Sequence, residues 1–190
     1  SVLKTRTEQH VLITTRAGKC IRFQGINEDG ELEVRHMGRV ARGVRGIKLK
    51  SEDEIAGLEM LEADADMLLL TVTENGYGKR TAIDKYRVQG RGGQGVINMV
   101  VDDRNGMVVG SVQVHDTDLI MMMTNTGRVI KIPVVNIRET QSRAAKGVRL
   151  MRIDKDERIV SVTRVVEPEE MDEEDALEGV DGLPVEGAEE

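Results

Sequence analysis

The residues best suited to binding chemistry in this chain are the arginine and glycines of the stretch VQGRGGQGV at 88–96. Its middle, GRGGQG, satisfies the G-x-G-x-x-G pattern of loops that bind dinucleotide phosphates. Such a loop needs a helix directly after the glycines, because the phosphates bind the backbone amides of the helix N-terminus. Here Gly95 is followed by the β-rich run VINMVV at 96–101. A strand in that place argues against a dinucleotide site.

Two other stretches of the chain align with this one. We call the three stretches the Arg/Gly segments: VARGVRGIKL at 40–49, VQGRGGQGVINM at 88–99 and TQSRAAKGVRLM at 140–151. The last copy loses the nucleotide pattern, but all three keep an arginine, three intervening residues, a glycine and an aliphatic residue. The aligned arginines are Arg42, Arg91 and Arg143, and the aligned glycines are Gly46, Gly95 and Gly147.

The shared residue types favour binding of phosphates. Arginine presents a fixed fork of donors to phosphate oxygens, and glycine allows close backbone approach or a positive φ. Repeated basic turns predict a periodic cationic rim that binds an extended polyanion through its phosphates. The alternative is that these are ordinary turn residues and solvated charges. Further basic candidates are Arg45 and Lys146 in the Arg/Gly segments, and Lys19 with Arg22, Lys79 with Arg80, and Arg128 with Lys131 in earlier turns.

The segments that must position these turns have the composition of short strands. A β-rich hairpin precedes each Arg/Gly segment, at 11–23, 67–83 and 119–132, and further strand candidates lie at 54–61, 107–114 and 158–166. Val, Ile, Leu, Met and Thr dominate these runs, and helix-length amphipathic windows are missing. The repeats, at about 8–61, 62–114 and 115–166, are roughly 50 residues long. This period predicts an all-β fold of propeller-like blades over residues 1–166.

The charge is distributed unevenly along the chain. Residues 167–190 hold twelve of the 34 acidic residues and no basic ones, so we expect a disordered acidic tail. The remaining 22 acidic residues face 27 basic ones, which gives residues 1–166 a formal charge of +5. The acidic tail therefore makes the net charge of the whole chain negative, although residues 1–166 are moderately basic.

Several classes of protein have little support. With Cys20 as the single cysteine, no internal disulfide is possible, and the chain fits a reducing cytoplasm. No apolar run approaches the roughly 18 residues that span a bilayer. The histidines His10, His36 and His115 lack neighbours at metal-ligand spacing, so no metal or cofactor is expected.

The runs TENGYGKRTAIDKYRVQGRGGQGVINM at 73–99 and RNGMVVGSVQVHDTDLIMMMTNTGRVIKI at 104–132 resemble the carboxy-terminal domain of DNA gyrase A subunits. The resemblance covers residues 8–166, and the acidic tail also suits that family. It implies a β-pinwheel, a disk of four-stranded blades whose basic perimeter bends and wraps duplex DNA. This chain is similar to the latter half of a six-bladed disk.

The family's hallmark box reads roughly Gln-Arg-Arg-Gly-Gly-Lys-Gly and belongs to its first blade. Residues 89–95 resemble a degenerate copy, in which Gly90 replaces an arginine and Gln94 replaces the lysine. The matching residues are Gln89, Arg91, Gly92, Gly93 and Gly95, and the copy at 141–147 retains Gln141, Arg143, Lys146 and Gly147.

The resemblance implies a DNA-binding and DNA-wrapping domain of a type IIA topoisomerase. Its partners would be duplex DNA, the breakage-reunion domain of the same polypeptide, and the gyrase B protein in an A2B2 complex in the bacterial cytoplasm, at the nucleoid. The chain itself would carry no catalytic residue and no cofactor, because the parent enzyme uses ATP and Mg through other domains. Two alternatives remain open: the corresponding domain of topoisomerase IV, and a propeller used for protein interaction.

Overall fold

The computed structural model describes residues 3, 9–25, 34, 37–61 and 67–165, and it confirms the all-β fold class. The tail at 167–190 lies outside the described residues. The strands are β1 His10–Thr15, β2 Lys19–Gln24, β3 Ile55–Leu61, β4 Leu68–Thr73, β5 Tyr77–Ala82, β6 Val96–Ile97, β7 Val108–Val114, β8 Leu119–Thr124, β9 Val129–Pro133, β10 Val148–Arg149 and β11 Ile159–Val165. Two short 3-10 helices, η1 Ile83–Lys85 and η2 Val134–Asn136, follow β5 and β9.

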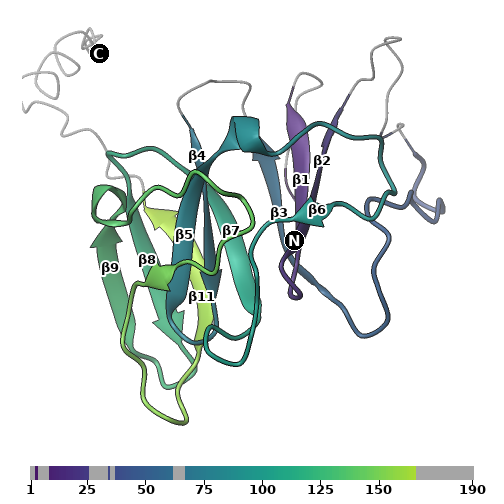
Figure 1. The fold of residues 1–190 in the computed structure, drawn as a ribbon. Helices are drawn as coiled ribbons and strands as arrows, with labels where there is room; N and C mark the ends of the chain where they lie inside the picture. The colour runs from purple at the N-terminus through teal and green to yellow at the C-terminus, as the bar shows by residue number, and fades with distance from the viewer. Residues whose placement is uncertain (1–2, 4–8, 26–33, 35–36, 62–66, 166–190) are drawn as a thin grey trace, which may run out of the picture.

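The strands form three antiparallel sheets, one for each repeat (Figure 1). The strand orders are β3-β1-β2-β6, β10-β5-β4-β7 and β11-β8-β9. Each sheet is built on a hairpin with a tight turn: β1 pairs with β2, β4 with β5, and β8 with β9. All the strand candidates from the sequence contain strands in the structure, whereas the Arg/Gly segment at 40–49 contains none.

The outer strand of a sheet comes from the following repeat. The segment 88–99 crosses from the second repeat and supplies β6 to the first sheet, where Lys19 pairs with Ile97. The segment 140–151 likewise supplies β10 to the second sheet, where Tyr77 pairs with Arg149. The third sheet has three strands among the described residues. The Arg/Gly segments therefore hold neighbouring sheets together as well as forming turns.

Glycine is required where these segments cross. Gly95 and Gly147 have φ values of +68° and +77°, a region that residues with a Cβ rarely adopt. A Cβ on Gly95 would stand 2.3 Å from the carbonyl oxygen of Cys20, and one on Gly147 would stand 2.6 Å from that of Gly78. Gly95 and Gly147 thus combine both expected roles, a positive φ and close backbone approach, whereas Gly46 has no positive φ and a Cβ there would meet the side chain of Ile13.

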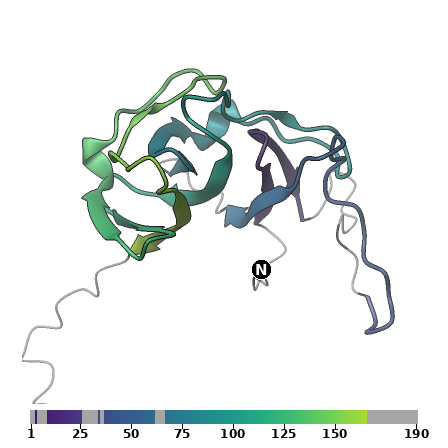
Figure 2. The same ribbon diagram turned by 90° about the horizontal axis from the view of Figure 1, so that it is seen from below.

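The three sheets stand side by side along an arc, with the segments leading into β6 and β10 on the convex side and β3, β7 and β11 toward the concave side (Figure 2). The middle sheet is covered on both faces. Alternate residues of β4 point opposite ways, so Leu69 packs in a cluster with Leu12 of the first sheet while Leu70 packs with Met122 of the third.

Within the described residues, no helix is long and apolar enough to cross a bilayer.

The crossing of segment 88–99 can be tested at its glycine. Gly95→Ala should lower the free energy of unfolding by more than about 2 kcal/mol, because it forces a side chain into positive φ and against the Cys20 carbonyl. Gly90→Ala is the matched control, since no atom lies within 4 Å of a Cβ at that position. Thermal unfolding of both variants measures the difference, and equal melting temperatures would contradict the described crossing.

Candidate nucleic-acid interface

Two aligned arginines tie consecutive Arg/Gly segments together on the convex side. Arg91 donates a hydrogen bond to the carbonyl oxygen of Arg45 at 3.0 Å, and Arg143 donates one to that of Ile97 at 2.6 Å. Each bond spans 46 residues of sequence. Both arginines are half-buried, so part of each guanidinium still reaches the surface. Arg91 and Arg143 thus combine a structural contact with positive charge on the convex side.

The glycines of the hallmark-like stretch serve backbone pairing. The amide of Gly92 donates to the carbonyl of Gly46 at 2.7 Å, and the carbonyl of Gly93 accepts from the amide of Lys48 at 2.8 Å. Gln89 donates through its backbone amide to the carbonyl of Arg22 at 2.8 Å. The side-chain amide nitrogen of Gln89 is buried and has no hydrogen-bond partner among the described residues, so it does not reach the surface where the predicted rim would need it.

Other candidate side chains are exposed to solvent. Arg42 and Arg45 are exposed on the first Arg/Gly segment. Lys146 is also exposed, and its ammonium lies 2.6 Å from a carboxylate oxygen of Asp102, where it lowers the pKa of that carboxyl. Lys131 is exposed on β9.

Arg128 is held by the third sheet. Its guanidinium donates to Glu157 at 2.5 Å and to the carbonyl of Arg152 at 2.8 Å. Glu157 is buried, so this ion pair neutralises a carboxylate inside the fold. The charge of Arg128 is therefore largely neutralised by Glu157 and contributes little to binding an external anion.

Arg80 is buried, which differs from the predicted exposed rim. It is 7% exposed and donates hydrogen bonds to the carbonyl of Ile137 and to the carboxylate of Asp116. Its equivalent Arg22 donates to the carbonyls of Ile83 and Tyr86 in the same way. Both arginines bind backbone carbonyls where the next repeat begins its crossing, and Arg80 also binds a carboxylate, so their donors are occupied by groups of the chain itself.

Lys79 is fully buried, and the prediction that its side chain lies on the rim is wrong. The reason is strand register: Lys79 pairs with Thr71, as Ile21 pairs with Ile13 and Ile130 with Met122. Lys79 thus occupies a core position that holds isoleucine in the other two repeats.

The Lys79 ammonium lies in a buried polar cluster between the first two sheets. It donates to Thr81 at 2.8 Å and to the hydroxyl of Tyr86 at 3.4 Å. Tyr86 donates to Asn98 at 2.8 Å, and Asn98 donates to Thr71 at 3.0 Å. Among the described residues, no carboxylate pairs with Lys79, and burial lowers its pKa to about 8.

Two arginines that the sequence reasoning missed lie on the convex segments. Arg87 and Arg138 occupy equivalent positions, directly after the residues Tyr86 and Ile137 that cap η1 and η2. Both are exposed, and neither forms an ion pair among the described residues. Their 51-residue separation is close to the repeat period and could have signalled them.

Comparison with known proteins places this geometry among domains of one kind. A family model described as "DNA gyrase C-terminal domain, beta-propeller" matches residues 9–62, 68–114 and 118–165. The chain is 45% identical over 175 residues to the DNA gyrase A subunit of Salmonella typhimurium, covering 92% of this chain and 19% of the relative. It is 42% identical over 186 residues to that of Escherichia coli, covering 98% and 20%. The chain thus spans about a fifth of the length of these curated relatives.

Two solved structures share the fold. The C-terminal domain of DNA gyrase A superimposes with a TM-score of 0.74 at 26% identity, over 85% of this chain and 52% of that one. The C-terminal domain of DNA topoisomerase IV superimposes with a TM-score of 0.77 at 24% identity, over 87% of this chain and 49% of that one. The second likeness concerns the fold alone.

Burial of Lys79 predicts a pH-dependent stability. The unfolded lysine keeps its proton up to about pH 10.5, whereas the folded one loses it near pH 8, so wild-type stability gains from this group as pH rises between these values. Lys79→Met removes the cost of burying the charge and should stabilise the fold at pH 7 by on the order of 2 kcal/mol.

Denaturant unfolding from pH 7 to 10 measures this effect. The advantage of Lys79→Met over wild type should shrink as pH rises, while the exposed control Lys50→Met should show no such trend. Cys20, whose pKa burial raises to about 12, titrates in the opposing sense and interacts with Lys79, so both variants are also measured in a Cys20→Ala background. If the difference in unfolding free energy between Lys79→Met and wild type stays constant with pH, the lowered pKa of the buried Lys79 ammonium is refuted.

Proposed function

Because the chain belongs to the DNA gyrase C-terminal domain family, we propose that it binds and wraps duplex DNA on its convex side as part of a gyrase A protein. In this role it presents a neighbouring DNA segment to the strand-passage site with a defined crossing handedness. The parent complex then uses ATP to introduce negative supercoils. The catalytic residues, ATP and Mg all belong to other domains.

One observation supports this proposal more than any other: the segments that cross between sheets carry cations at equivalent positions along the arc. A curved row of separated charges suits a bent duplex, because it meets successive phosphates without reading bases. The proposed contacts are Arg42, Arg45, Arg87, Arg138 and Lys146, together with the half-buried Arg91 and Arg143. Lys79 and Arg80 are left out, because their cationic groups are buried.

The partners follow from membership of a gyrase A protein. We propose that the chain works beside the gyrase B protein and the breakage-reunion domain of its own polypeptide, within an A2B2 complex in the cytoplasm at the nucleoid. The corresponding part of topoisomerase IV is the second candidate, since its C-terminal domain has the same fold. Identity of 45% to a gyrase A protein favours gyrase.

The electrostatic basis of binding is tested by salt dependence. The logarithm of the DNA association constant should fall linearly with the logarithm of salt concentration, by about 0.9 per phosphate contact. Arg87→Ala with Arg138→Ala removes two exposed charges that no internal ion pair uses among the described residues, so the slope should become shallower by about 1.8. Fluorescence anisotropy of a labelled duplex at several salt concentrations measures both slopes.

The matched control is the charge-preserving pair Arg87→Lys and Arg138→Lys. It should keep most of the slope, because the slope counts the phosphates that a positive charge neutralises, and lysine keeps that charge even where it loses the guanidinium fork. A binding constant that does not change with salt, or equal slopes for wild type and the alanine variant, would refute the proposed contacts.

A further inference from the structure

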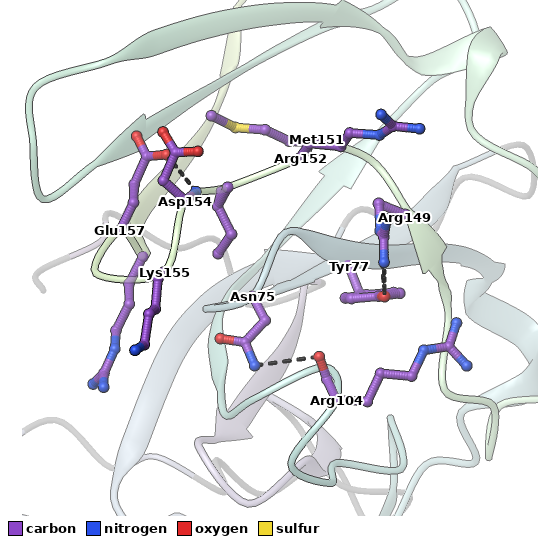
Figure 3. Close-up of a pocket in the computed structure, with 11 residues that line it drawn as sticks. Asn75, Tyr77, Arg104, Arg149, Met151, Arg152, Asp154, Lys155 and Glu157 are labelled. Atoms are coloured by element: carbon purple, nitrogen blue, oxygen red, sulfur yellow. Dashed lines mark hydrogen bonds between the residues drawn. The ribbon is translucent and has the colours of Figure 1, made fainter.

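A second group of cations surrounds a pocket between the second and third sheets (Figure 3). The pocket has a volume of about 440 Å³ and lies beside the β4–β5 turn. Its walls come from that turn, from the loop before β7, from β10 and from the loop between β10 and β11. It includes none of the residues of the predicted rim.

The pocket is strongly cationic. Five exposed basic side chains line it, and none of them forms an ion pair in the described part of the chain: Arg104, Arg149, Arg152, Lys155 and Arg158. Two acidic residues also line it. Glu157 is buried against Arg128 and accepts hydrogen bonds from Thr126 and the backbone of Asp154, so its charge is already neutralised. Asp154 is exposed and offsets one of the five cations, so the walls still carry a net positive charge.

Tyr77 holds the guanidinium groups of two of these arginines in place before an anion binds. The guanidinium of Arg104 lies 4.8 Å from the centre of the Tyr77 ring, and that of Arg149 lies 5.4 Å from it. Arg149 also donates to the Tyr77 hydroxyl at 2.8 Å. An arginine stacked on a rigid ring loses less conformational entropy when it binds an anion. Figure 3 shows Arg104 and Arg149 near Tyr77, with Lys155 across the pocket.

In the described part of the chain, this arrangement occurs in the second sheet and is not repeated in the first. The pair Tyr77 and Arg149 corresponds by strand register to Lys19 and Ile97 in the first sheet. Ile97 cannot donate to an anion, and Lys19 offers no ring for stacking. The pocket is thus a local feature of one junction, unlike the convex charges, which recur with the repeat.

We propose that this pocket is a phosphate-binding site, in which Arg104 and Arg149 bind phosphate oxygens from one side and Lys155 with Arg158 from the other. β10, which carries Arg149, belongs to the Arg/Gly segment at 140–151, and the part of this segment that leads into β10 lies on the convex side (Figure 2), so the pocket adjoins that side. The phosphate comes from the backbone of the wrapped duplex, which makes the pocket an anchor between the second and third sheets. This source rests on the proposed DNA-binding function, whereas a free polyphosphate offers the same chemistry.

The test uses two probes, sodium tripolyphosphate and a labelled duplex. Wild type should bind tripolyphosphate with a saturable isotherm in calorimetry. Arg104→Gln with Arg149→Gln should weaken that binding at least about tenfold, because charge-assisted hydrogen bonds are lost. Lys155→Gln with Arg158→Gln removes charge from the opposite wall without touching Tyr77, and it should weaken binding in the same direction. Arg87→Gln with Arg138→Gln is the control, since it removes two charges outside the pocket.

The outcomes answer two questions separately: whether the pocket binds phosphate, and whether that phosphate belongs to DNA. Loss of both tripolyphosphate and duplex affinity in the pocket variants supports a DNA anchor. Loss of tripolyphosphate affinity alone overturns the DNA source and supports a site for free polyphosphates, even if the chain binds no DNA. Equal losses of tripolyphosphate affinity in the pocket and control variants, or no saturable tripolyphosphate binding by wild type, would overturn the phosphate site itself.

Discussion

The structure depends on one constraint: the hairpin sheet of a repeat is completed by a strand from the next repeat. The carbonyls of Gly18 and Gly76, at the hairpin turns, each accept hydrogen bonds from two successive amides of the incoming segment. The incoming backbone passes so close that glycine is needed at Gly95 and Gly147. Since β6 and β10 are only two residues long, pairing alone is a small part of the attachment. Arg22 and Arg80 add to the attachment by binding the carbonyls of the incoming chain.

The same constraint explains how charge is divided between folding and function. A crossing segment must pass over the outside of the arc, so basic residues on it face solvent unless a neighbouring carbonyl captures them. Arg80 lies on β5, before the crossing, where the carbonyl of Ile137 binds it and its side chain is buried, whereas Arg87, seven residues later and next to the crossing segment, is exposed. Arg91 is in between, with one hydrogen bond to the preceding Arg/Gly segment and part of its surface outside. Basic residues close together in sequence therefore have different roles, which their position along the crossing determines.

Much of the fold could be predicted from the sequence, because the hairpins consist of strong strand formers flanked by glycine turns. Gly95 and Gly147 of the glycine column were also predictable, since a positive φ and a close approach to backbone both select glycine. The exchange of strands was not, because a two-residue strand has no periodicity to detect. Lys79 was misplaced because the repeats were aligned by their basic turns. Alignment by strand register would have placed Lys79 beside Ile21 and Ile130 and indicated a core position.

The central claim, that the convex side wraps duplex DNA, is tested most directly by plasmid topology. A nicked plasmid is saturated with the protein, sealed by ligase, stripped of protein and resolved by gel electrophoresis. Wrapping with positive crossings predicts that the linking number rises in proportion to the bound protein, because each wrapped segment traps writhe of one sign. A distribution of topoisomers identical to that of the protein-free plasmid, at protein concentrations that saturate the DNA, would contradict it.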